Sequence, residues 1–130
     1  MSEQPRKRIL VVEDEEKLAR LLTVQLEMAG YEVHAVAYGR EAVQYAAEHQ
    51  PDLTLLDVRL PDIDGNEVCK ELRRLYHSWV MPVLMVTALD QPIDQLRGFA
   101  HGADAYVTKP FEFSELMATV SMLLGETAST

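Results

Sequence analysis

The sequence predicts an α/β protein built on one doubly wound, largely parallel sheet of five strands covered by five helices. Two observations lead to this prediction. Short apolar runs recur along the chain, and the segments between them carry apolar residues at helical spacing. Strands joined by helical crossovers run parallel, and strands without polar alternation are typical of sheets covered on both faces. We therefore expect a layer of helices on each side of the sheet.

The first half of the chain alternates strand and helix three times. Acidic residues at positions 13–16 suit the positive end of the first helix dipole, and Pro51 follows the end of the second helix. The expected elements are the strand 9–12, a helix stopping near Gly30, the strand 32–36, the helix 40–48, the strand 53–57 and the helix 66–76. The residues expected to face the core from the first and third helices are Leu18, Leu21, Leu22, Leu26, Val68, Leu72 and Leu75.

The second half of the chain continues the pattern. Pro92 suits the first turn of a helix and Gly102 suits the residue after its end. Trp79 precedes the fourth strand and is either a lid over the core or a partner contact; we favour the lid. The expected elements are the strand 83–86, the helix 92–100, the strand 105–107 and the helix 113–124.

Composition restricts the classes of function. At 130 residues the chain is expected to form one domain, with its core at about 8–124, and flexible tails at 1–7 and 125–130. The second tail suits either a free end or the start of a linker. No apolar run approaches the ~20 residues that cross a bilayer, and no secretory signal is evident. A single cysteine, Cys69, expected to be partly buried, fits a reducing compartment, so we expect a cytoplasmic protein. The net charge of −9 argues against binding to nucleic acid or membranes by this chain itself.

Polar residues gather at the carboxyl ends of the predicted strands. Glu13 and Asp14 follow the first strand, Asp57 ends the third, and Thr87 and Lys109 follow the fourth and fifth. Such ends meet at one edge of a parallel sheet, where ligands bind. Taken one at a time, Asp57 or Thr87 would more often cap a turn or a helix, and Lys109 would more often be solvated. Their position at the same edge of the sheet favours a binding site instead. Oxygen ligands suit Mg²⁺, and a hydroxyl and an ammonium can hold phosphoryl oxygens while Asp57 attacks in line.

Together these residues resemble the receiver domain of bacterial two-component response regulators. The resemblance runs from about Arg8 to Leu124 and includes the connecting segments 60–65 and 102–111. It implies a flavodoxin-like fold with strand order 2-1-3-4-5, the order for which the chemotaxis receiver is a standard example. It also implies that the Lys109–Pro110 peptide bond is cis.

The resemblance implies a role for each residue of the cluster. Asp57 would accept a phosphoryl group from a sensor histidine kinase or from a small donor such as acetyl phosphate. Asp14, Asp57 and the backbone carbonyl of Arg59 would bind Mg²⁺, with Glu13 acting through water; Mn²⁺ is expected to substitute. The domain would then be no enzyme beyond its own phosphorylation and dephosphorylation.

The resemblance also implies a switch. Lys109 and Thr87 would contact the phosphoryl oxygens, and Tyr106 would follow Thr87 inward, although simple core packing of Tyr106 is an equal alternative. The surface of the fourth helix, fifth strand and fifth helix would change and act on an output domain or downstream protein. Arg59 and Leu89, two residues past Asp57 and Thr87, would border the path of an attacking water, and the bulky Leu89 would slow hydrolysis.

That surface also forms homodimers in DNA-binding members of the family, through a ladder of charged residues. Arg97, Asp104 and Glu115 resemble parts of this ladder, whereas Ala105 and Thr119 replace an acid and its basic partner. A homodimer is therefore possible on fewer ion pairs.

Two other classes of function remain as alternatives. A flavodoxin-like electron carrier would need a hydroxyl- and glycine-rich phosphate cradle where the first loop is acidic, and no Gly-x-Gly-x-x-Gly or Walker lysine is present. A Mg²⁺-dependent phosphohydrolase of the aspartate-dependent kind would have an Asp-x-Asp pattern beginning at Asp57, which this sequence lacks. A non-phosphorylated interaction module with the same fold would typically have lost an acid or Lys109, and all are present.

Overall fold

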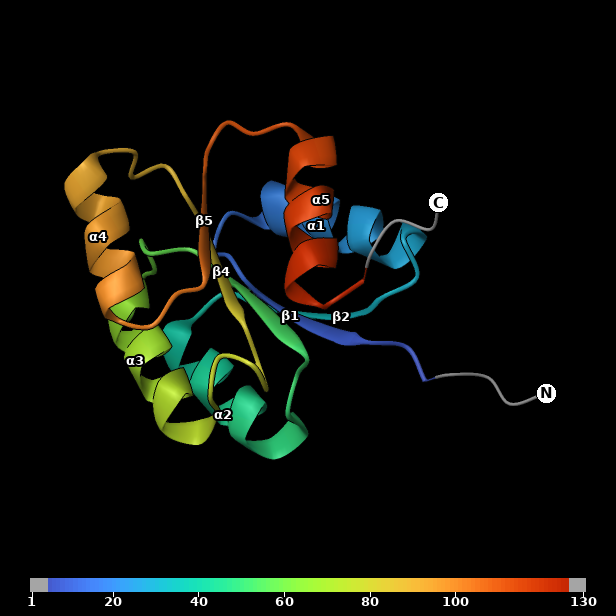
Figure 1. Ribbon diagram of the computed structural model, residues 1–130, viewed down its shortest axis with the longest axis horizontal. Helices are drawn as coiled ribbons and strands as arrows, with labels where there is room; N and C mark the ends of the chain where they lie inside the picture. The colour runs from blue at the N-terminus through green and yellow to red at the C-terminus, as the bar shows by residue number, and fades with distance from the viewer. Residues whose placement is uncertain (1–4, 127–130) are drawn as a thin grey trace.

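The computed structural model describes residues 5–126 and confirms the predicted architecture (Figure 1). Five strands pair in parallel in the order β2-β1-β3-β4-β5. The strands are β1 (Arg8–Val12), β2 (Glu32–Val36), β3 (Leu53–Leu56), β4 (Val83–Thr87) and β5 (Ala105–Thr108). The helices are α1 (Glu16–Met28), α2 (Gly39–His49), α3 (Gly65–Leu75), α4 (Pro92–Ala100) and α5 (Phe113–Leu123).

The sheet separates two hydrophobic cores. One core lies between the sheet and α2 and α3, and the other lies between the sheet and α1 and α5 (Figure 1). Strand β1 contributes to both, because Leu10 and Val12 face the first core while Ile9 and Val11 face the second. All four side chains are at most 1% exposed. An apolar run without polar alternation therefore belongs to a central strand, as predicted.

The predicted element boundaries agree with the structure to within one or two residues, but two predicted core residues are wrong. Leu21 of α1 is 45% exposed and Leu75 of α3 is 42% exposed, whereas Leu22, Leu26 and Leu72 are fully buried. Each helix rests one narrow face on the sheet, so leucines at the margin of that face stay in solvent.

The lid interpretation of Trp79 is also wrong. Residues 78–80 form a turn that carries the indole outward, where it is 82% exposed and stacks on the ring of His77 at 4.6 Å. Cys69, by contrast, is more deeply placed than expected: it is fully buried, and burial raises the pKa of its thiol to about 11.

The chain ends of the described part are tied to the domain. Glu126 accepts a hydrogen bond from the hydroxyl of Tyr31, and the Lys7 ammonium lies 3.5 Å from the carbonyl oxygen of Leu124. Residues 1–4 and 127–130 of the expected tails lie outside the described residues. Between residues 5 and 126 no helix has the length and apolarity to cross a bilayer.

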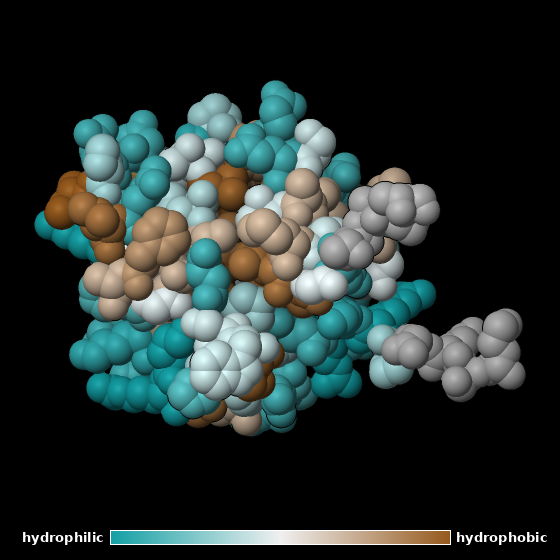
Figure 2. Space-filling model, viewed as in Figure 1, coloured by the Kyte–Doolittle hydropathy of each residue, from teal (hydrophilic) through white to brown (hydrophobic). Residues whose placement is uncertain are grey.

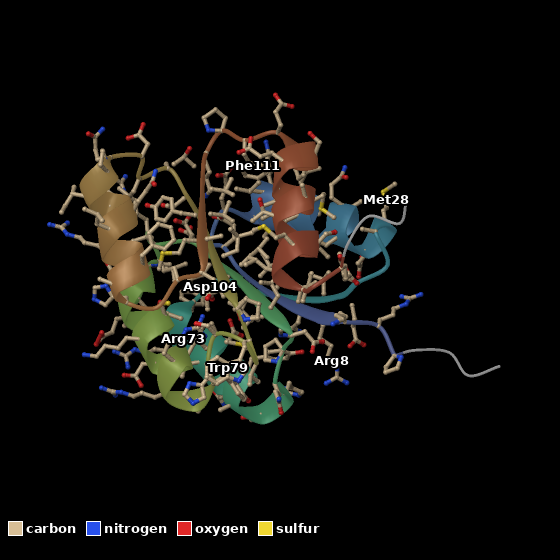
Figure 3. All side chains as sticks on the ribbon, viewed as in Figure 1. Arg8, Met28, Arg73, Trp79, Asp104 and Phe111 are labelled. Carbon is tan, nitrogen blue, oxygen red and sulfur yellow. The ribbon has the colours of Figure 1, made fainter. Side chains whose placement is uncertain are left out.

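Arg73 joins α3 to two other parts of the fold (Figure 3). Its Nε donates to the carbonyl of Gly102 at 2.8 Å, its Nη1 donates to the carbonyl of Met81 at 2.8 Å, and its Nη2 forms an ion pair with Asp104 at 2.5 Å. The same Asp104 oxygen accepts the backbone N–H of Val83 at 2.8 Å. The guanidinium thus connects α3 to the start of β4 and to the turn between α4 and β5.

We expect Arg73→Met to lower the free energy of unfolding by about 3 kcal/mol, because the Asp104 carboxylate and two carbonyls lose a largely buried partner. Urea denaturation measures the change. Arg74→Met is the matched control: Arg74 pairs with Glu71 in solvent, and its loss should lower stability by less than about 1 kcal/mol. Equal losses in the two variants would contradict the structural role of Arg73.

Candidate functional site

The predicted residues meet at the carboxyl edge of the sheet. Glu13 follows β1, Asp57 follows β3, Thr87 ends β4 and Lys109 follows β5. The Lys109 Nζ lies 2.7 Å from Glu13 Oε1 and 2.8 Å from Asp57 Oδ2. Carboxylate oxygens of Glu13, Asp14 and Asp57 lie within 4.8 Å of one another. Residues 96 positions apart in the chain thus form one cluster.

Backbone hydrogen bonds that extend the sheet hold this cluster. The N–H of Glu13 donates to the carbonyl of Val36 at 3.0 Å, and the N–H of Asp57 donates to the carbonyl of Val12 at 3.1 Å. In the same way, Lys109 N–H donates to Thr87 carbonyl at 2.8 Å. Each side chain therefore leaves a backbone that a neighbouring strand has already placed.

Burial and charge oppose each other in the cluster. Glu13 and Asp57 are only 4% and 6% exposed. Burial raises the pKa of Glu13 above its usual value, although its hydrogen bond from Lys109 partly offsets the rise. Burial alone would lower the pKa of Lys109, but hydrogen bonds to Asp57 and Glu13 outweigh it and the pKa is raised. Lys109 therefore stays charged at neutral pH and compensates two buried acids.

A glycine lets α3 begin directly against Asp57. The N–H of Gly65 donates to the carbonyl of Val58 at 2.7 Å. A Cβ at position 65 would lie 2.2 Å from the carbonyl oxygen of Asp57, a distance that the backbone cannot accommodate. Gly65 thus permits a close approach that any residue with a Cβ would prevent.

The two predicted switch residues are linked through the backbone of one residue, Leu89. The N–H of Leu89 donates to Thr87 Oγ1 at 3.3 Å, and the Leu89 carbonyl accepts the hydroxyl of Tyr106 at 2.8 Å. Burial is the main cause that raises the pKa of Tyr106 to about 12, so the phenol remains a donor. Sequence reasoning missed this bridge; its only signal was the place of Leu89 two residues after Thr87.

Of the charged residues that resemble a dimer ladder, not all are free to pair with a second copy of the chain in this structure. Asp104 is paired with Arg73 inside the domain, and its side chain is 21% exposed. Arg97 and Glu115 are exposed on α4 and α5.

The donor set fits a hard divalent cation. Three carboxylates supply oxygen ligands, Asp14 is exposed and lets a cation enter, and no soft sulfur or imidazole ligand is part of the cluster among the described residues.

Comparison with known proteins assigns the family. A family model described as the response regulator receiver domain matches residues 9–121, so the chain belongs to that family. Receiver domains are regulators of two-component systems rather than classical enzymes, and they work with histidine kinases and output domains.

Individual relatives agree with this assignment. The chain is 45% identical over 120 residues to the DNA-binding dual master transcriptional regulator RpaA of Synechocystis, covering 92% of this chain and 50% of that protein. It is 47% identical over 118 residues to the alkaline phosphatase synthesis transcriptional regulatory protein PhoP of Bacillus subtilis, covering 91% and 48%. The chain thus spans about half the length of these relatives. A CheY-like receiver domain from Methanospirillum hungatei superimposes with a TM-score of 0.88 at 30% identity, covering 93% and 95%.

We expect Lys109→Met to lower the free energy of unfolding at neutral pH by about 3 kcal/mol in metal-free protein, since two buried carboxylates lose their cation. The loss should shrink as the pH falls. The raised pKa of Glu13 means that its burial is unfavourable above that pKa and is relieved when it is protonated below it.

Urea denaturation across a pH series measures this effect. The exposed Lys70→Met on α3 is the control and should change stability little at any pH. A loss in Lys109→Met that stays constant with pH would contradict the electrostatic cause.

Proposed function

We propose that this receiver domain accepts a phosphoryl group on Asp57 from a sensor histidine kinase and passes the signal to an output domain or downstream protein. The observation that carries the proposal is the ammonium of Lys109 lying 2.8 Å from the buried carboxylate of Asp57, beside two further acids. A carboxylate so placed is held at a fixed position, and the lysine is ready to contact the oxygens of a group bonded to it.

Mg²⁺ fits the chemistry of the donors: Asp14, Asp57 and the backbone carbonyl of Arg59 would hold it, with Glu13 acting through water, and it would offset the charge of an incoming phosphate. The protein residues do the rest. Asp57 Oδ attacks the phosphorus in line while the bond from phosphorus to the leaving imidazole nitrogen or acyl oxygen breaks. Lys109 and the hydroxyl of Thr87 then hold the new phosphoryl oxygens.

The hydrogen bonds of the Leu89 backbone support a way in which a change at Asp57 could alter the surface of α4. When Thr87 Oγ1 turns to the phosphoryl group, its hydrogen bond from the N–H of Leu89 is broken. The carbonyl of the same Leu89 accepts the hydroxyl of Tyr106, so the change reaches β5. Phosphorylation would thereby bias the packing of α4 against β5 by a differential interaction at one residue. The exposed face of α4 is apolar, as the brown residues over α4 in Figure 2 show, and includes Ile93, Leu96 and Phe99 at 52%, 65% and 45% exposure. Such a patch suits a protein partner, an output domain or a second copy of the chain.

We expect incubation with acetyl phosphate and Mg²⁺ to add the mass of one phosphoryl group to the protein, as measured by intact mass spectrometry. Asp57→Asn removes the nucleophile, and a chelator removes the cation, so neither sample should gain the adduct. Asp52→Asn, another acid near a strand end but at the opposite edge of the sheet, should be phosphorylated like the wild type.

A folded wild type that binds Mg²⁺ but forms no adduct would overturn the phosphoacceptor assignment. The remaining function would then be an interaction module that keeps the receiver fold without phosphorylation.

A further inference from the structure

The loop between β3 and α3 carries the residues on which the cation site depends. It begins at Asp57, includes Arg59 and ends at Asp64, directly before α3. Its two ends are well held, because Asp57 N–H donates to Val12 and Gly65 N–H donates to Val58. Between these ends Arg59 is exposed, and its N–H donates to Asp57 Oδ1 at 3.1 Å.

The middle of the loop is attached to a different helix by Asp62. Asp62 Oδ1 accepts the N–H of Gly39 at 2.8 Å, and Oδ2 accepts the N–H of Arg40 at 2.9 Å. These are the first two residues of α2, whose N–H groups have no partner within the helix. Tyr38, the residue before the helix, provides no side-chain cap, so a carboxylate 22 positions away does so.

Packing strengthens the same attachment. Gly39 is buried, and a Cβ at this position would lie 2.7 Å from Ile63 Cγ1 and 2.6 Å from Val68 Cγ2. The glycine therefore allows the loop and the start of α3 to lie directly on the first turn of α2. The two hydrogen bonds from α2 also lower the pKa of Asp62, Arg40 N–H being the first cause, so the carboxylate stays charged at neutral pH.

These contacts connect both sides of the acidic cluster. On one side, Glu13 N–H donates to Val36, the last residue of β2, three residues before α2 begins. On the other side, Asp62 joins the first turn of α2 to the loop three residues after Arg59. Glu13 and the loop that carries Arg59 are thus attached to two points of the chain, Val36 and the first turn of α2, that lie three residues apart.

We propose that Asp62 is a positioning residue for the cation site: by anchoring the 57–64 loop to α2 it fixes the Arg59 backbone relative to Asp57 and the acids beside it. The inference rests on the proposed function, because it assigns Asp62 to the same site. Asp62 touches neither the cation nor the phosphoryl group, and it acts through the loop. It differs from a simple helix cap because its loss should weaken cation binding as well as the end of α2.

We expect Asp62→Ala to weaken Mg²⁺ binding about tenfold, the range in which supporting residues of metal sites act. Isothermal titration with Mg²⁺ alone measures the affinity. In metal-free protein, hydrogen exchange should be faster than in the wild type at the amides of Gly39 and Arg40 and at those of residues 58–64 other than Pro61, which has no N–H. Saturating Mg²⁺ should restore the rate of phosphorylation by acetyl phosphate, so the change appears in the Mg²⁺ requirement rather than in the maximal rate.

Matched variants separate positioning from general destabilisation. Asp52→Ala removes an equivalent bond, from Arg8 N–H to Asp52 Oδ2 at 2.7 Å, at the opposite edge of the sheet, and should leave Mg²⁺ affinity unchanged. Arg40→Pro removes one donor while keeping Asp62, in the first turn of α2 where proline breaks no hydrogen bond within the helix, and should give a smaller loss. Asp62→Asn keeps an acceptor oxygen and should recover part of the affinity.

Wild-type Mg²⁺ affinity in Asp62→Ala would overturn the inference, whatever its exchange rates, and so would an equal loss in Asp52→Ala. A wild type that binds Mg²⁺ but takes no phosphoryl group would defeat the proposed function alone, because the comparison of Mg²⁺ affinities needs no phosphoryl donor.

Discussion

The contact on which the site depends is the ammonium of Lys109 between the carboxylates of Glu13 and Asp57. The carboxylate oxygens of these two acids lie within 4.8 Å of each other and are almost excluded from water, so their charges repel each other. Burial also makes the charge of each unfavourable. The lysine lies between both from a third strand end, so its ammonium offsets their charge. Their oxygens therefore remain available as ligands, and in the proposed reaction Asp57 would be the nucleophile and the same lysine would contact the product.

This arrangement depends on the parallel sheet more than on any loop. Because β1, β3 and β5 end at one edge, residues far apart in sequence leave the core side by side, and ladder hydrogen bonds set the position of each backbone. The helices add what the strands cannot. The first turn of α3 reaches the Asp57 peptide only because residue 65 is glycine, and the first turn of α2 receives the Asp62 carboxylate in place of a local cap.

The sequence was sufficient for the fold, for the strand order by resemblance, and for the meeting of Glu13, Asp14, Asp57 and Lys109 at one edge of the sheet. The spacing of apolar residues and the polar residues after each strand can be read locally in the sequence. The parallel topology then brings those polar residues together at one edge of the sheet. Some contacts could not be predicted, because each depends on which loops are neighbours in space; these are the contacts of Arg73, of Asp62 and of the Leu89 backbone. Trp79 was misjudged for a related reason: an apolar neighbourhood in sequence did not reveal that its turn points away from the core.

The position of Arg73 has a mechanical consequence for α4. The guanidinium holds the turn after this helix, at Gly102 and Asp104, against α3 and the start of β4. The other end of α4 follows the connection 88–91, in which Leu89 is hydrogen-bonded to Thr87 and Tyr106 while its neighbours are exposed. A helix that is held at one end tilts rather than slides, and a tilt displaces its other end most. A tilt of α4 about its held end, near His101, would therefore move Ile93, at the start of the helix, furthest.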